Sequence, residues 1–120
     1  NIHIFDMARA YEFLINAPKD KVSGQIFNAG YENQTVNHLA QLVKRVIGDD
    51  VKIKKITSDD NRSYHISSNK IKTELGFEAK HTIRDAVEDL CDAFDKNLLP
   101  NSLNNEMYFN IKRMQNLELI

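Results

Sequence analysis

The sequence predicts an α/β fold, because short strand-like runs alternate with amphipathic helical segments along the first 100 residues. The clearest strand signal is the run GQIFNAG at residues 24–30, which is apolar on both faces and therefore suits a strand with neighbours on each side. The clearest helical signal is a stripe of apolar side chains at helical spacing: Val36, Leu39, Ala40, Val43, Val46 and Ile47. The predicted order is strand, helix, strand, helix, strand and then two helices, with at least one parallel pair.

The first predicted unit is a short strand at residues 2–5 followed by a helix. Asp6 has the position and residue type of an N-cap. Apolar residues then recur at helical spacing: Met7, Ala10, Tyr11 and Leu14. Pro18 ends this helix, since the residue before a proline avoids helical geometry. A strand at residues 25–29 follows, and Gly30 closes it.

The second predicted unit begins with Thr35, which can cap a helix that Gly48 terminates. Residues 51–56 alternate at first between apolar and basic side chains, which indicates a half-exposed strand, and residues 64–66 indicate a brief extended segment.

The last helices carry clear end signals. Ser67 or Ser68 begins a short helix, and Gly76 ends it. Thr82 and Asp85 have the spacing of a capping box for a final helix that fades before Pro100. The sequence therefore predicts one structural unit over residues 1–100, followed by an Asn-rich, weakly helical tail over residues 101–120.

Composition narrows the classes of function. The formal net charge is −1, which gives no reason to expect nucleic acid or an anionic membrane as a partner. No apolar run approaches the roughly 20 residues that span a bilayer. Cys91 is the single cysteine, so an internal disulfide is impossible and a reducing, cytoplasmic setting fits.

Motifs for catalysis, cofactors and metals are missing from the sequence. The four glycines are spread out, so neither a dinucleotide fingerprint nor a phosphate loop is present. The four histidines lack the spacing of metal ligands: His3, His38, His65 and His81. We therefore expect no catalytic, cofactor-binding or metal-binding residue in this chain.

Four segments nevertheless resemble segments of one enzyme family, and they follow one another in the same order and with similar spacings. The segments are IHIFDMARAYEFL, GQIFNAGYENQTVNHLAQLV, NRSYHISSNKIKTELGF and HTIRDAVEDL. Together they are similar to the C-terminal part of the extended short-chain dehydrogenase/reductases, the NAD-dependent epimerase/dehydratase family that modifies nucleotide sugars. The resemblance covers about residues 1–100 and does not include the tail.

This resemblance implies that the chain is a fragment of a nucleotide-sugar epimerase or 4,6-dehydratase. The catalytic residues and the NAD(P) site would lie in a Rossmann domain outside this chain. The chain itself would be the substrate-binding part, inactive alone, and residues 25–29 would supply a late strand of the Rossmann sheet.

The resemblance also implies which residues meet the nucleotide sugar. Arg62 matches the arginine that grips the diphosphate, and a guanidinium fork suits that geometry. Asp60 would orient Arg62 or meet sugar hydroxyls, although Asp59 could take the same role. Tyr64 would line the nucleotide pocket, and Asn28 would stand at the carboxyl end of a strand, where open α/β sheets bind ligands.

A different class of function is also compatible with the sequence. The chain could be a self-contained, non-enzymatic α/β module that binds partners through exposed strand edges or its helical tail. Pairing of an open strand edge with a second copy would give a homodimer in either case.

Overall fold

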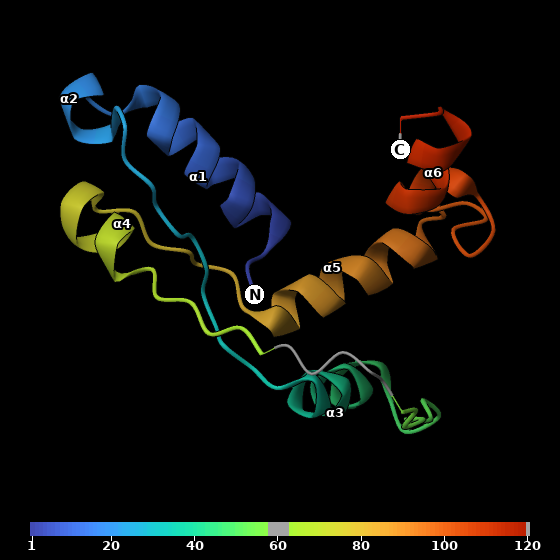
Figure 1. The fold of residues 1–120 in the computed structure, drawn as a ribbon. Coiled ribbons are helices and arrows are strands. Elements are labelled where there is room, and N and C mark those ends of the chain that lie inside the picture. The colour runs from blue at the N-terminus through green and yellow to red at the C-terminus, as the bar shows by residue number, and fades with distance from the viewer. Residues whose placement is uncertain (58–62, 120) are drawn as a thin grey trace. The chain divides into compact units, whose positions relative to one another are not determined.

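The structure is a computed structural model, and it describes residues 1–57 and 63–119. Within these residues it contains helices and no strand (Figure 1). The helices are α1 (Ile4–Asn16), α2 (Lys19–Val22), α3 (Val36–Ile47), α4 (Asn69–Leu75), α5 (Ile83–Asp95), η1 (Glu106–Tyr108) and α6 (Asn110–Asn116). None of these helices is long and apolar enough to cross a bilayer.

The predicted α/β fold is therefore wrong. Residues 25–29, 51–56 and 64–66 form irregular connections instead of strands. Of residues 2–5, expected as the first strand, Ile4 and Phe5 already belong to α1. A helix bonds its own backbone locally, whereas a strand needs a second strand beside it. Among the described residues no backbone ladder forms at these segments, so their preference for extended structure does not produce a sheet.

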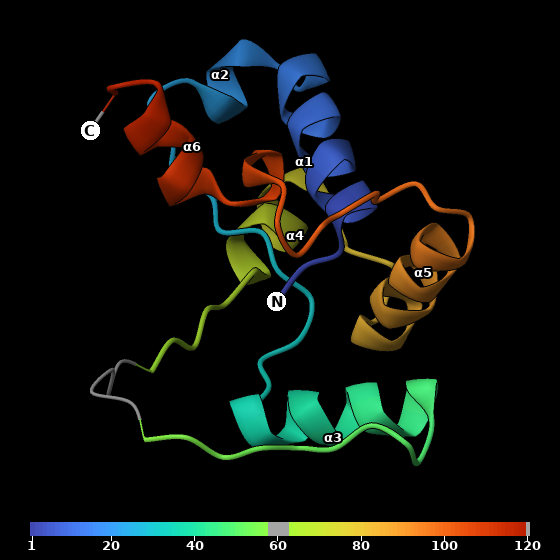
Figure 2. The ribbon, with the colours of Figure 1, turned by 90° about the vertical axis from the view of Figure 1, so that its right-hand side faces the viewer.

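The local helix signals are confirmed. Thr35 caps α3, because its hydroxyl accepts a hydrogen bond of 3.2 Å from the backbone N–H of His38. Gly48 follows the last turn of α3, and the chain then reverses so that residues 51–57 run back along this helix (Figures 1 and 2). Gly76 ends α4 with a left-handed backbone at φ +79°.

The expected cap of α1 is wrong by three residues. His3 is the N-cap, and its imidazole Nδ1 accepts a hydrogen bond of 3.2 Å from the backbone N–H of Phe5. Asp6 instead lies in the first turn of the helix, where it is fully buried. Its carboxylate is thus free to bond a distant segment.

The chain divides into two compact units, Asn1–Asp89 and Leu90–Ile120, and α5 spans the boundary. The core of the first unit is a small cluster in which Ala10 of α1 meets Ile71 of α4 and the adjoining Phe77. Phe27 and Ala29 pack against this cluster from the irregular segment between α2 and α3. The second unit holds η1 and α6, which the carboxylate of Glu106 joins through the side chains of Arg113 and Asn116.

Replacing Gly76 with alanine is expected to lower the free energy of unfolding by about 1–2 kcal/mol. The reason is the left-handed backbone at this position, which crowds a Cβ against the following carbonyl oxygen. Chemical denaturation measures the change. Gly76→Asn is the matched control and should lose about half as much, because asparagine tolerates this conformation better. Equal stability of Gly76→Ala and the wild type would contradict the assignment.

Candidate functional site

The candidate site is a junction where four segments, distant in sequence, are joined by polar contacts. We call it the junction and define it by residues 1–6, 30–33, 66–69 and 80–85. All of them lie in the first compact unit.

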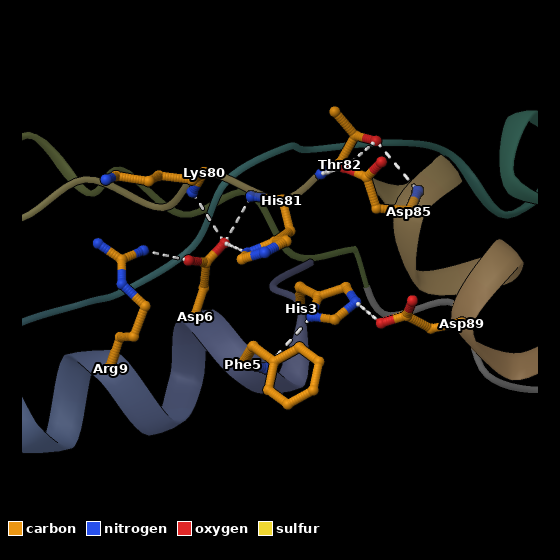
Figure 3. Close-up of polar contacts among 9 residues, drawn as sticks. All are labelled: His3, Phe5, Asp6, Arg9, Lys80, His81, Thr82, Asp85 and Asp89. Atoms are coloured by element: carbon orange, nitrogen blue, oxygen red, sulfur yellow. Dashed lines mark hydrogen bonds and ion pairs between the residues drawn. The ribbon is translucent and has the colours of Figure 1, made fainter. Parts of the chain in front are cut away.

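The buried carboxylate of Asp6 joins α1 to the segment before α5 (Figure 3). Its Oδ2 accepts hydrogen bonds from the backbone N–H groups of Lys80 at 2.8 Å and His81 at 2.7 Å. Its Oδ1 accepts a hydrogen bond from the guanidinium of Arg9, one turn along α1. A charged acceptor with this many donors forms a strong link, because hydrogen bonds to ionised groups exceed those between neutral groups.

These donors fix the ionisation of Asp6. Burial raises the pKa of its carboxyl group, but the hydrogen bonds from the backbone N–H groups of His81 and Lys80, together with the nearby His81 and Arg9 side chains, outweigh burial. The result is a pKa lowered from 3.8 to about 2. Asp6 is therefore an anion at neutral pH, and its charge contributes to the stability of the folded chain.

His3 and His81 form a stacked pair beside this link, with ring centroids 4.8 Å apart (Figure 3). Because His3 Nδ1 accepts from Phe5, the proton of the neutral ring lies on Nε2, which is 3.2 Å from a carboxylate oxygen of Asp89. His81 Nδ1 lies 3.1 Å from Asp6 Oδ2, without the geometry of a hydrogen bond. Two imidazoles are thus held between carboxylates of α1 and α5.

Thr82 and Asp85 begin α5 with the reciprocal capping box that the sequence predicts. Asp85 Oδ2 accepts from the backbone N–H of Thr82 at 2.6 Å and from its hydroxyl at 2.8 Å. The Thr82 hydroxyl in turn accepts from the backbone N–H of Asp85 at 3.2 Å. The two hydrogen bonds that the Asp85 carboxylate accepts lower its pKa, and the bond from the backbone N–H of Thr82 has the larger effect. The start of α5 is consequently well ordered beside the imidazole pair.

The other half of the junction joins the segment after Gly30 to the segment before α4. The Asn33 amide donates to the carbonyl of Ile66 at 2.8 Å, and its oxygen accepts from the N–H of the same residue at 3.1 Å. The Ser68 hydroxyl donates to the carbonyl of Gly30 at 3.0 Å. Asn1 also contacts this half of the junction, since its backbone carbonyl accepts a hydrogen bond of 2.8 Å from the N–H of Tyr31.

Two cavities open at this half of the junction, with volumes of about 260 Å³ and about 250 Å³. Both are lined by Gly30, Tyr31, Ser68 and Asn69, so we treat them as one groove, the junction groove. The larger cavity adds carboxylate, amide, imidazole and hydroxyl groups from residues 32–33 and 65–67. Such a lining suits a hydroxyl-rich ligand, because a few convergent polar groups fix its orientation.

The structure describes only some of the residues that the family resemblance assigns to substrate binding. Asp60 and Arg62 lie outside the described residues, as does the alternative acid Asp59. Tyr64 is 76% exposed, and Asn28 is also exposed. The expectation that Asn28 stands at the end of a strand is wrong, because the described residues form no sheet.

The structure keeps Asn28 and Tyr64 apart. The two segments that carry them run in opposite directions, since contacts link residue 26 to 70, residue 30 to 68 and residue 33 to 66. Asn28 therefore lies toward the α4 end of this alignment, and Tyr64 lies beyond its other end.

Sequence reasoning missed three groups of the junction groove: Tyr31, Asn33 and Ser68. The polar run that follows Gly30 was a usable signal, because polar residues after a buried segment often face a ligand. The pairing of Asn33 with Ile66 crosses 33 residues, and no local pattern encodes it. Among the described residues no group of three or more His, Cys, Asp or Glu side chains could hold a metal ion.

No family model, curated protein or solved structure matches this chain.

Proposed function

We propose that this chain is the substrate-binding part of an NAD(P)-dependent enzyme that modifies nucleotide sugars, an epimerase or a 4,6-dehydratase. The proposal assigns the hydride-transfer chemistry and the NAD(P) site to the remainder of that enzyme. It places the enzyme in the cytoplasm, where the single Cys91 stays reduced. On its own the chain binds substrate and does not turn it over.

The observation that carries the proposal is the set of hydrogen bonds that anchors residues 66–68, which follow Arg62 in the sequence. Asn33 bonds both backbone groups of Ile66, and Ser68 bonds Gly30, so the chain is held in place within a few residues after Arg62. A guanidinium that binds a diphosphate benefits from an anchored backbone nearby, because bidentate contacts depend on geometry as well as charge. The residues that form these hydrogen bonds also line the junction groove.

The groove suits the other parts of a nucleotide sugar. Tyr31 is 46% exposed at its edge, where an aromatic ring can stack on a base or cover the apolar face of a sugar. Asn69 and Ser67 offer amide and hydroxyl groups beside it. We assign the diphosphate to Arg62, and the ribose, base or sugar to the groove, with Tyr64 on the connecting stretch.

Nuclear magnetic resonance on the isolated chain tests this proposal. UDP-glucose, dTDP-glucose, GDP-mannose and CDP-glucose are titrated separately to about 10 mM, a range that reports weak binding. At least one sugar nucleotide is expected to shift the amide signals of residues 30–33 and 64–69. NAD⁺ at the same concentration is expected to leave these signals unchanged. The proposal fails if no sugar nucleotide moves them, or if NAD⁺ moves them equally.

A further inference from the structure

The larger cavity of the junction groove contains a carboxylate that is held in place. Glu32 lines this cavity and is half-buried. Its backbone carbonyl accepts a hydrogen bond of 3.3 Å from the side-chain amide of Asn1. Its side-chain Oε2 accepts a hydrogen bond of 3.3 Å from the side-chain amide of Gln34. The backbone and the side chain of Glu32 are therefore both anchored beside the cavity.

The negative charge of Glu32 is not paired with a cation in the part of the chain that the structure describes. Among the described residues only Gln34 donates to this carboxylate, and no Lys or Arg of theirs lines the larger cavity. In the smaller cavity the ammonium group of Lys72 is already paired with Glu78. A carboxylate has about four lone-pair positions for donors, so most of those on Glu32 remain available to a ligand.

A cavity of this kind favours hydroxyl donors and disfavours anions. Hydroxyl groups form short, strong hydrogen bonds with a carboxylate, whereas a like charge placed beside it lowers affinity. Four further residues with polar side chains line the same cavity: His65, Ser67, Ser68 and Asn69. Together with Glu32 they offer more polar groups than the hydroxyl pair of a ribose can use. The ring of a hexose carries more hydroxyl groups and matches this lining better.

We propose that the larger cavity binds the hexose of the nucleotide sugar, and that Glu32 selects a neutral hexose against a uronic acid. This inference rests on the proposed function and narrows it to one class of sugar. A neutral hexose presents hydroxyl groups that donate to the Glu32 carboxylate. A uronate presents a second carboxylate, for which the described lining of the cavity holds no Lys or Arg. In the proposed function Arg62 is engaged by the diphosphate and does not supply this cation.

Paired ligands test this selection, because a neutral sugar nucleotide and its uronate differ only at C6 of the hexose. For each base that binds, the neutral compound is compared with its C6-oxidised counterpart, such as UDP-glucose with UDP-glucuronate and GDP-mannose with GDP-mannuronate. Dissociation constants are measured from the amide shifts of the isolated chain. The wild type is expected to bind the neutral compound about tenfold more tightly. Glu32→Gln removes the charge and keeps the size of the side chain, so it should reduce this ratio to about twofold or less.

Glu74→Gln is the matched control, because it removes the same charge from an exposed acid of α4 that lines neither cavity. It should keep the ratio at about tenfold. The ratio compares two ligands on one chain, so a partial loss of folded protein affects both and cancels. A wild type that binds the uronate equally well or better, or a ratio that Glu32→Gln leaves unchanged, overturns the inference while the proposed function stands. If no member of any pair binds, the proposed function fails and the inference fails with it.

Discussion

Replacing Asp6 with alanine is expected to lower the free energy of unfolding by about 3–5 kcal/mol. The substitution leaves the backbone N–H groups of Lys80 and His81 without their acceptor and removes the carboxylate beside Arg9. Because small domains have a total stability of about 5–15 kcal/mol, the loss approaches complete unfolding. Urea denaturation followed by circular dichroism measures it.

Glu12→Ala is the matched control for this prediction. Glu12 is an exposed acid on the same helix, so its removal should change the free energy of unfolding by less than about 0.5 kcal/mol. If both variants lose the same small amount, the Asp6 link does not hold the two segments together.

The same link gives stability a defined dependence on pH. The pKa of Asp6 is about 2 in the folded chain and 3.8 without the fold, so its contribution is complete above pH 3.8 and is lost as the pH falls through about 2. The shift corresponds to about 2 kcal/mol. Asp6→Asn should remove this component, so the curves of the variant and the wild type should converge toward pH 2. Parallel curves would contradict the low pKa of Asp6.

Replacing Arg62 with alanine is expected to raise the dissociation constant for the preferred sugar nucleotide about tenfold to a hundredfold. The expectation follows from the proposed function, in which Arg62 meets the diphosphate, and a hydrogen bond to a charged group contributes about 1.5–3 kcal/mol. Titration calorimetry or amide shifts in the isolated chain provide the measurement. In the complete enzyme the same change should raise the KM for the sugar nucleotide strongly.

Two comparisons make the Arg62 experiment specific. Arg45→Ala removes the same charge from an exposed arginine of α3, outside the junction, and it should leave affinity unchanged. The nucleoside without phosphates should bind the wild type and Arg62→Ala equally, because it has no group for the guanidinium. Equal affinity of the two chains for the sugar nucleotide would eliminate the role given to Arg62.

Helix ends are predictable from this sequence because their signals are local. Thr35 and His38, or Thr82 and Asp85, are three residues apart, and their hydrogen bonds form within one turn. Gly76 likewise acts at its own position, through a backbone angle that other residues rarely adopt. Elements that depend on such signals therefore begin and end close to where the sequence places them.

Strands and the junction are not predictable in the same way, because they depend on partners far along the chain. The run GQIFNAG has the composition of a buried strand, yet the described residues offer it side chains of α4 instead of a second strand. Asp6 shows the same limit: its residue type correctly indicates that it accepts backbone hydrogen bonds, but the donors are 74 and 75 residues away instead of three.

The long span closed by Asp6 has a consequence for the chain as it is synthesised. Helix α1 leaves the ribosome before the segment that anchors it, and a 13-residue helix alone is marginal in water. The backbone donors that anchor it belong to Lys80 and His81, which emerge some 74 residues later. Closing so long a loop is slow, since distant contacts must first be brought together. The nascent chain therefore carries an unanchored helix with an exposed Ile4 and Phe5 until residues 80 and 81 have emerged, the interval in which a chaperone has the most to bind.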